Sequence, residues 1–351
     1  MAKLILAGQV VTGLGQGAGF TQLDWVREQF MVKLGIDPHP GTLNLSLSKP
    51  ADLALWAELK AHADTFIMPP DPIWCQARGY PVRIAGRLPG AIIVPEVPGY
   101  PETQVEIIAA LPIRQELALV DGDDLTLEIN QPLPIRAVIF DVDGTLVDTL
   151  EAYRVVAELA ATPHGIPISA EVVRQALNNN HPTFWELVVS ADRPDRMELM
   201  EAMKREAMRC WPEVLQRHGR VMPGLRETLE TLQSRGIRLG IVTGSRGGSF
   251  QPLRDAGLLD FFEVIVTGAD VARSKPDPEG LLKCAAVLGV EPDQAVYVGD
   301  TPTDVQASRA AGMAAVAVLS GAGDSALLSA AGPDWILYSH ARLSEIIILG
   351  R

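Results

Sequence analysis

Short apolar runs separated by Gly, Pro and Asp turns fill the chain up to about residue 130. They lie at residues 82–88, 91–94, 105–110 and 125–129, and the apolar start at 4–11 has the same character. Runs of this length between turn residues are typical of β-strands. The first part of the chain therefore predicts a compact, mostly β barrel.

The remainder of the chain shows a different pattern. Apolar runs at 137–140, 239–242, 264–266, 295–298 and 315–318 alternate with stretches of helical character. Continuous apolar strands separated by helices predict a parallel sheet that is covered on both faces. The predicted fold class is α/β: a small β barrel followed by a Rossmannoid parallel sheet.

One connection in the second part is long. Residues 149–222 are rich in helix formers with scattered Trp and Met, which predicts a helical insertion, or cap. A chain of 351 residues is expected to divide into domains, and the polar, proline-bearing stretch at 130–134 is the expected boundary. We predict domains at 1–130 and 135–351, the latter with a core of 135–148 and 223–351.

Composition excludes several classes of protein. The net charge of -13 works against a nucleic-acid partner, because such binding depends on a basic surface. Three widely spaced cysteines without a CxxC pair fit a reducing cytoplasm. No run approaches the roughly 20 apolar residues of a membrane span. We expect a soluble cytoplasmic protein; an oligomeric state does not follow from the sequence.

The strongest chemical motif is Asp141-Val142-Asp143-Gly144-Thr145, directly after an apolar strand. Residues two apart on an extended segment point the same way, so Asp141 and Asp143 are expected together at the carboxyl end of that strand. Ligands of open α/β sheets bind at this edge. The following glycine permits a tight turn whose amides face a phosphate.

Three later strand ends add Thr243, Lys275 and the pair Asp300 and Asp304. Taken singly, these residues and the acidic motif have ordinary interpretations: an acidic turn, a solvated lysine or a satisfied strand-end hydroxyl. Because the four motifs occur in order and each follows a strand, a functional interpretation is favoured.

This ordered set resembles the haloacid dehalogenase-like phosphatases over residues 135 to about 345, and the helical insertion resembles their phosphoglycolate phosphatase-like branch. The resemblance implies that Asp141 is the nucleophile and Asp143 the general acid and base. It also implies that Thr243 donates a hydrogen bond to the phosphate, and that Lys275 holds both nucleophile and phosphate.

A magnesium site is implied by the same resemblance. Asp300 would bind Mg²⁺ with Asp141 and the carbonyl of Asp143, and Asp304 would support the metal shell. Hard Mg²⁺ prefers carboxylate and carbonyl oxygens. Because a general acid supplies only about 10²–10⁴ in rate, most of the barrier reduction must come from positioning and charge.

A glycine-rich string at 13–19 is the notable feature of the first part. Alternating glycines let a backbone pass close to phosphates. The string is neither a P-loop nor a Rossmann fingerprint, because no GK[ST] follows and the next helix is expected to start late. Alone, it would be interpreted as a flexible hairpin loop.

Together with the strings at 40–44, 90–95, 105–109, 113–117 and 121–123, the glycine string resembles the archaeal-type CTP-dependent riboflavin kinases across about 130 residues. That family has a small β-barrel and converts riboflavin to FMN with CTP as phosphate donor. The resemblance thus implies riboflavin, FMN and CTP as partners of the first domain.

The resemblance also implies the binding residues of this domain. Those for the nucleotide are Gly13, Leu14, Gly15, Gln16, Gly17, Ala18, Leu111, Pro112, Ile113 and Arg114. Thr42 and Asn44 would coordinate Mg²⁺, and their spacing of two directs both side chains to one face of a strand. Glu106 and the position of Pro98 would contact the flavin. Without the family, these positions would be an ordinary strand edge and strand face.

Three positions depart from the family pattern. Family members often have basic residues where Ala18 and Pro112 stand, and a flavin-binding hydroxyl where Pro98 stands. Losing two cations would weaken binding of a triphosphate, since each charge contributes in a partly desolvated site.

The histidines show no metal-ligand spacing, and most of them are expected at surface or satisfied polar positions. In the insertion, His181, Phe184, Trp185 and Trp211 could line a substrate pocket. Aromatics at helical spacing are more often packing residues, so core roles are favoured.

The sequence thus predicts a bifunctional flavin-pathway enzyme, a phosphatase joined to a riboflavin kinase. By pathway analogy, the phosphatase substrate is expected to be a phosphorylated ribitylamino-pyrimidine precursor of riboflavin. The alternatives are an FMN or sugar-phosphate phosphatase whose first domain is a non-catalytic flavin or nucleotide sensor, or a dimerisation module.

Overall fold

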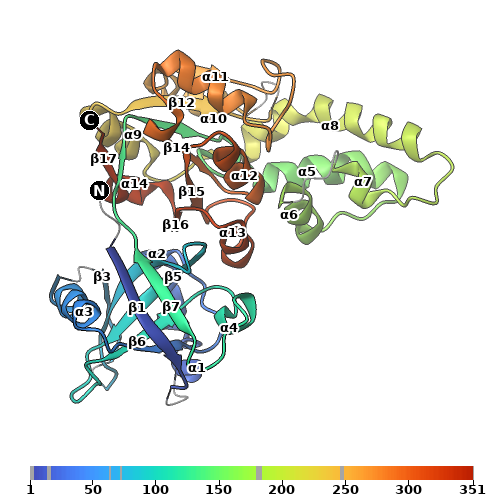
Figure 1. Ribbon diagram of the computed structural model, residues 1–351. Helices are drawn as coiled ribbons and strands as arrows, with labels where there is room; N and C mark the ends of the chain where they lie inside the picture. The colour runs from blue at the N-terminus through green and yellow to red at the C-terminus, as the bar shows by residue number, and fades with distance from the viewer. Residues whose placement is uncertain are drawn as a thin grey trace. The chain divides into compact units, whose positions relative to one another are not determined.

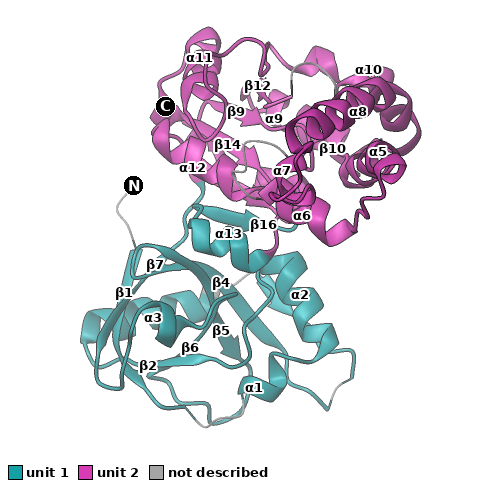
Figure 2. Cartoon of the chain, turned by 90° about the vertical axis from the view of Figure 1, so that its right-hand side faces the viewer, with its two compact units in different colours: residues 1–132, 325–338 teal, residues 133–324, 339–351 magenta. Residues whose placement is uncertain are grey.

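The structure is a computed structural model that describes residues 4–13, 17–62, 65–71, 73–178, 184–245 and 249–350. The chain forms two compact units, coloured separately in Figure 2. The first, here called the barrel unit, comprises residues 1–132 and 325–338; the second, the sheet unit, comprises 133–324 and 339–351.

Six antiparallel strands of the barrel unit close on themselves, because the outermost two, β4 and β7, also pair. In barrel order they are β4 (Ala77–Ile84), β5 (Leu88–Pro95), β6 (Gln104–Ile108), β2 (Leu43–Ser46), β1 (Leu4–Val11) and β7 (Asp124–Ile129). A short strand, β3 (Thr65–Ile67), pairs with β4 outside the closed barrel. The predicted small β barrel is confirmed.

The expected run at 82–88 is wrong as a single strand. Strand β4 ends at Ile84 and β5 begins at Leu88, and the two form an antiparallel hairpin. Ala85 and Gly86 have positive φ values of 51° and 69°, so the chain turns back between them. The apolar character of both strand ends concealed this turn.

Alternate side chains of the strands fill the barrel. Leu6, Leu45, Ile84, Ile92, Ile107 and Leu127 belong to one buried cluster. The helices of this part are α1 (Gly17–Phe20), α2 (Asp24–Leu34), α3 (Pro50–His62) and α4 (Ile113–Glu116). Helix α2 buries Val26, Phe30 and Leu34 in a second cluster together with Ile93 of β5.

Residues 325–338 join the barrel unit from far along the chain; they form α13 (Ser325–Ala331) and β16 (Trp335–Leu337). The hydroxyl of Ser325 accepts from the amide of Asp37 at 3.1 Å, and Asp334 pairs with Arg83 at 2.6 Å. Gly35, which follows α2 with a φ of 70°, lies very close to β16. A Cβ on Gly35 would be only 2.0 Å from the Ile336 carbonyl oxygen.

The sheet unit is built on a parallel sheet. Its strands run in the order β13 (Val264–Val266), β12 (Arg238–Val242), β9 (Ala137–Phe140), β14 (Ala295–Gly299) and β15 (Ala314–Val318). Strands β9 and β14 are buried throughout, which explains their continuous apolar sequences. The helices are α9 (Leu225–Ser234), α10 (Gln251–Asp255), α11 (Glu279–Leu288), α12 (Pro302–Ala310) and α14 (Leu343–Ile346). The predicted Rossmannoid α/β fold is confirmed.

Two small sheets complete this unit: β8 (Leu133–Ile135) pairs with β17 (Ile347–Leu349), and β10 (Val147–Asp148) with β11 (Arg220–Val221). Between β10 and β11, the described residues form the helices α5 (Leu150–Ala161), α6 (Ala170–Asn178), α7 (Trp185–Val188) and α8 (Arg196–His218). Helices α5 and α8 lie side by side (Figure 1). Short 3₁₀ turns occur at Thr162–His164, Leu259–Phe261, Pro292–Gln294 and His340–Arg342.

Candidate active sites

The carboxyl end of β9 carries the acidic motif of the sheet unit. Asp141 follows the strand directly, is buried, and its amide donates to the Val298 carbonyl of β14 at 2.9 Å. Gly144 adopts a φ of 76°, in the left-handed region that glycine permits. The turn therefore presents Asp141 at the edge of the sheet.

Lys275 lies at the centre of this edge and is only 13% exposed. Its ammonium donates to Asp141 at 2.7 Å, to Asp304 at 2.6 Å and to the Tyr297 hydroxyl at 2.9 Å. Burial by itself would lower the pKa of Lys275, but the two carboxylates outweigh burial and hold that pKa well above its ordinary value. Lys275 therefore remains charged.

Asp304 is fixed by the first turn of α12. Its second carboxylate oxygen accepts from the amides of Asp300 at 3.2 Å and Thr301 at 3.0 Å, and from the Thr301 hydroxyl at 2.7 Å. Thr301 is the N-cap residue, and the two residues form a reciprocal capping box. A helix start thus positions an acidic residue against Lys275.

Asp300 is held by a loop that the sequence reasoning missed. The Ala322 amide donates to its carboxylate at 2.8 Å. A Cβ on Gly144 or on Gly321 would lie 2.3 or 2.0 Å from the same carboxylate, so glycine is required on both sides. The sequence could have indicated this loop, because the segment that contains Gly321 and Ala322 follows β15, and β15 ends at the same edge of the sheet.

Asp141, Asp300 and Asp304 offer carboxylate oxygens that all lie within 4.8 Å of one another. Burial raises the pKa of Asp141 to about 7, and burial also raises that of Asp300 well above its ordinary value. One ammonium does not neutralise three buried carboxylates. The donor set, all oxygen and strongly acidic, fits a hard divalent cation such as Mg²⁺.

Asp143 has different surroundings from Asp141. Its carboxyl accepts from the Ser249 hydroxyl at 2.7 Å, and Thr149 and Tyr153 also hydrogen-bond to it. Burial raises the pKa of Asp143, which favours a protonated carboxyl. Two carboxyls separated by one residue therefore have environments suited to different roles.

A cavity of about 510 Å³ joins these groups. Besides the acidic residues and Lys275, it is lined by Thr243 at the end of β12, by Ser245, and by Tyr153 and Leu177 of the helical insertion. The Thr243 hydroxyl accepts from the Ser245 amide at 3.2 Å. The structure thus brings all six residues predicted for this site to one cavity.

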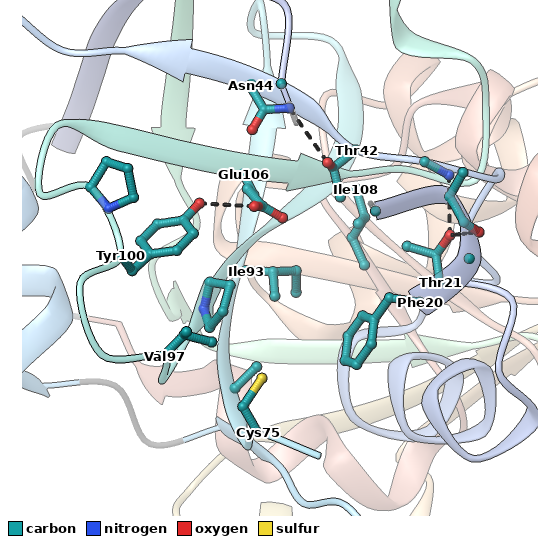
Figure 3. Close-up of a pocket in the computed structure, with 18 of the residues that line it drawn as sticks. Phe20, Thr21, Thr42, Asn44, Cys75, Ile93, Val97, Tyr100, Glu106 and Ile108 are labelled. Atoms are coloured by element: carbon teal, nitrogen blue, oxygen red, sulfur yellow. Dashed lines mark hydrogen bonds between the residues drawn. The ribbon is translucent and has the colours of Figure 1, made fainter. Parts of the chain in front are cut away.

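The barrel unit has a larger cavity of about 950 Å³, shown in Figure 3. Phe20, Ile93 and Ile108 give it an apolar wall. Glu106 of β6 lies in the same cavity and accepts from the Tyr100 hydroxyl at 2.9 Å. Burial raises the pKa of Glu106, and it also raises that of Tyr100, so both groups favour their protonated forms.

The described part of the glycine string, Gly13 and residues 17–19, lines this cavity. A Cβ on Gly13 would overlap the Asn44 side chain, and one on Gly17 would lie 2.7 Å from the Thr42 hydroxyl, so glycine allows this approach. Leu14, Gly15 and Gln16 lie outside the described residues. The expectation of a late helix is wrong, since α1 begins at Gly17.

Thr42 and Asn44 lie side by side, with the Asn44 amide 3.5 Å from the Thr42 hydroxyl (Figure 3). Gln104 donates to the Asn44 side-chain oxygen at 2.7 Å. Asn44 belongs to β2, whereas Thr42 immediately precedes it. The two predicted metal ligands are therefore neighbours at the cavity wall.

An adjoining cavity of about 220 Å³ is lined by Thr42 and by the predicted nucleotide segment, Leu111, Pro112, Ile113 and Arg114. Arg114 lines both cavities of the barrel unit. Its guanidinium pairs with Asp121 at 2.7 Å and donates to the Val11 carbonyl at 3.1 Å.

Pro98 also lines the larger cavity, as do Tyr100 and Cys75. Sequence reasoning missed the last two, because a tyrosine in a proline-rich loop and a lone cysteine carry no motif. The signal for Tyr100 was its place beside Pro98, where the resemblance calls for a hydroxyl.

Comparisons with known proteins agree with this division. Residues 138–318, just over half of the chain, match the family model of haloacid dehalogenase-like hydrolases. The chain belongs to this family. Residues 10–129 match the family model named for CTP-dependent riboflavin kinase, described as a domain of unknown function, DUF120. The chain thus joins a haloacid dehalogenase-like phosphatase and a CTP-dependent riboflavin kinase domain, a hydrolase and a transferase.

The chain resembles curated phosphoglycolate phosphatases. That of Neisseria meningitidis is 34% identical over 219 residues, covering 60% of this chain and 93% of the relative. That of Shigella boydii is 29% identical and covers 60% and 92%. A solved structure of a predicted phosphoglycolate phosphatase from Haemophilus somnus matches with a TM-score of 0.54 and 26% identity, over 60% of this chain and 97% of that one.

Other residues weighed from the sequence have varied environments. Phe184 and Trp185 pack edge to face, with ring centroids 4.8 Å apart, within a buried cluster, whereas His181 lies outside the described residues.

The side chain of His340 is fully buried, and its Nε2 atom has no hydrogen-bond partner. His340 is therefore an exception to the expectation that most histidines lie at surface or satisfied polar positions. Within the described ranges, no helix has the length and apolar character needed to cross a membrane.

Proposed function

We propose that this chain is a bifunctional flavin-pathway enzyme. Its second part would hydrolyse a phosphate monoester through an aspartyl-phosphate on Asp141, with Mg²⁺, and its first part would phosphorylate riboflavin to FMN with CTP. The observation that carries the phosphatase proposal is the contact of Lys275 with both Asp141 and Asp304, beside Asp300.

In the proposed phosphatase reaction, an Asp141 oxygen attacks the phosphorus while the bond to the leaving oxygen breaks. Asp143, whose burial favours the protonated carboxyl, donates its proton to that oxygen. The resulting carboxylate then accepts a proton from water, which attacks the phosphorus and releases inorganic phosphate and Asp141. Lys275 and Thr243 hold the phosphate oxygens throughout.

A magnesium ion, when bound, would offset the negative charge of the phosphate so that an anionic nucleophile can approach it. Asp141 and Asp300 would hold it, with the carbonyl of Asp143, and Asp304 would support this shell. The three buried carboxylates support this assignment. The family resemblance supplies the separate roles.

The substrate that we propose for the phosphatase is a phosphorylated ribitylamino-pyrimidine. Removing its phosphate would feed the pathway that a riboflavin kinase completes, whereas hydrolysis of FMN would undo the product of the other domain. The curated relatives are named for phosphoglycolate instead. Far faster hydrolysis of FMN than of the pyrimidine phosphate by the purified protein would contradict this proposal.

For the kinase domain, we propose that the loop from Gly13 to Ala18 holds the CTP phosphates and that Thr42 and Asn44 hold Mg²⁺. Residues 111–114 would bind the cytidine, and Glu106 the flavin, beside the position of Pro98. The shared lining of the two adjoining cavities by Thr42 and Arg114 supports this arrangement, because donor and acceptor must meet there.

We further propose the domain division 1–130 and 135–351, with residues 149–222 acting as a cap over the phosphatase site. The insertion contributes Tyr153 and Leu177 to the cavity that contains Asp141, which supports a role in enclosing the substrate. A cytoplasmic location is part of the same proposal.

One observation favours a second candidate. Ala18, Pro98 and Pro112 line the barrel cavities where the kinase family often has charged or hydroxyl side chains. A barrel that has lost these groups would bind flavin or nucleotide without transferring phosphate, and would serve as a sensor.

The deciding experiment measures FMN formation from riboflavin, with Mg²⁺ and either CTP or ATP, by the full chain carrying Asp141→Asn. This substitution prevents the phosphatase from removing product. FMN made with CTP but not with ATP would support the kinase. Tight flavin binding without FMN formation would select the sensor.

A further inference from the structure

A third cavity, of about 270 Å³, lies within the helical insertion of the sheet unit. Helices α5, α6, α7 and α8 all contribute to its wall, and most of the lining is apolar. Among the described residues that line it, Lys204 is the one charged side chain. The proposed reaction assigns no role to this cavity.

The cavity adjoins the phosphatase site, because Tyr153 and Leu177 line both. Tyr153 connects them chemically: its hydroxyl hydrogen-bonds to Asp143, the proposed proton donor, and its ring packs on Trp211 with centroids 4.6 Å apart. A molecule whose phosphate lies at Asp141 would therefore extend past Tyr153 into this cavity.

Aromatic side chains make up part of the wall. Trp211 and Trp185 line it together with Phe184 and Tyr153, and aromatic faces bind ring systems by offset stacking or edge contacts. Water gains few hydrogen bonds in such a lining, so an apolar group that displaces it is favoured. A leaving group of only a few atoms, such as glycolate, would leave the cavity unfilled.

We propose, building on the phosphatase function above, that this cavity binds the leaving group of the substrate. That group is a flat aromatic or heteroaromatic ring system joined to the phosphate by a short chain. The insertion thus selects phosphate monoesters of ring-bearing alcohols over small phosphorylated acids.

Ala176 on α6 offers a test, because it lines the cavity and a larger side chain there fills it. Ala170 on the same helix is exposed and provides the matched control. The probes are 1-naphthylmethyl phosphate, which carries a flat ring on a one-carbon linker, and phosphoglycolate. The quantity measured is the ratio of kcat/KM for the two esters, with Mg²⁺ present.

The unsubstituted protein is expected to prefer the naphthylmethyl ester by about tenfold or more, the size of effect that a filled apolar pocket supplies. Ala176→Phe should lower that ratio about tenfold, mainly through KM, and Ala170→Phe should leave it unchanged. An unchanged ratio in Ala176→Phe, or no preference in the natural sequence, would overturn the inference while the phosphatase function stands.

Hydrolysis of neither ester would count against the phosphatase function instead. The cavity would then be tested by equilibrium dialysis of 1-naphthylmethyl phosphate against the Asp141→Asn protein, with and without Ala176→Phe. Binding that weakens about tenfold in the double variant supports the inference, and equal binding by both proteins contradicts it.

Discussion

Lys275 in the sheet unit and Arg114 in the barrel unit each line a proposed substrate-binding cavity, but their surroundings differ. Lys275 is 13% exposed and contacts two carboxylates, whereas Arg114 is 39% exposed and pairs with Asp121, which is 49% exposed. Exposed ion pairs contribute little to stability, and losing one partner of a buried pair costs much. The buried ion pairs of Lys275 with Asp141 and Asp304 therefore hold the side chains of the phosphatase site in place.

The same contrast extends beyond the two cations. The carboxylates of the phosphatase site are tied to one another, to helix α12 and to the Gly321–Ala322 loop. In the barrel cavity, Glu106 is held by Tyr100 against a mainly apolar wall. The phosphate chemistry proposed at Asp141 needs hydrogen-bond donors and charges that are already in position, while the barrel cavity offers shape and a few directed hydrogen bonds.

The largest effect that tests this comparison comes from Lys275→Met. Removing the ammonium leaves Asp141 and Asp304 without their shared donor, so we expect kcat for phosphate release to fall about 10³-fold or more. Lys283→Met, which changes an exposed lysine on α11, should have little effect. A loss below tenfold would show that the network is not essential.

The association of residues 325–338 with the barrel unit is tested by Gly35→Ala. This change places a Cβ 2.0 Å from the Ile336 carbonyl oxygen in a backbone at φ 70°. We expect the free energy of unfolding to fall by about 3 kcal/mol or more, since overpacking adds to the cost of a left-handed alanine. Urea denaturation measures this change.

Gly86→Ala is the matched control, because its φ is 69° and its Cβ would meet nothing within 4 Å. Gly86→Ala should lower the free energy of unfolding by only about 1–2 kcal/mol, the cost of an alanine in the left-handed conformation. Equal losses in the two variants would mean that Ile336 does not pack against Gly35.

The buried imidazole of His340 makes the stability of the sheet unit sensitive to acid. Burial lowers the pKa of His340 to about 4, below its ordinary value of 6.5. The unfolded chain therefore binds a proton first, and the contribution of His340 to stability is lost as the pH falls from about 6.5 toward 4. The raised pKa values of the buried carboxyls change the stability with pH in the opposite direction. The effect of His340 is therefore measured by comparing the natural sequence with a variant that lacks this imidazole.

We expect the natural sequence to lose about 2 kcal/mol more than His340→Gln between pH 7 and pH 5, measured as the change in unfolding free energy. His39→Gln, at an exposed position of the barrel unit, should follow the natural sequence. The same pH dependence in the natural sequence and His340→Gln would rule out a neutral buried imidazole.

The smallest expected effect is that of Tyr100→Phe in the barrel cavity. Without the hydroxyl, Glu106 loses its donor, and riboflavin should bind about fivefold more weakly, as the loss of about 1 kcal/mol implies. Tyr338→Phe, at an exposed position, is the control. Isothermal titration of riboflavin into the Asp141→Asn background gives both constants, and unchanged affinity would remove Tyr100 from the binding site.

The sequence by itself determined the features that local periodicity and strand ends express. Continuous apolar runs predicted β9, β12 and β14, and the spacing of the motifs predicted that Asp141, Lys275 and Asp300 would meet. This succeeds because parallel strands place their carboxyl ends at one edge. In the barrel, short runs between turns predicted the strands, although not the turn at Ala85.

Only the tertiary structure decided the contacts made by segments without periodicity. The Gly321–Ala322 loop holds Asp300, and residues 325–338 belong with a barrel that ends nearly two hundred residues earlier. The pairing of Tyr100 with Glu106 and the cavity beside Tyr153 are of the same kind. Such contacts depend on how loops and helices pack together in three dimensions. The spacing of residues along the chain does not predict that packing.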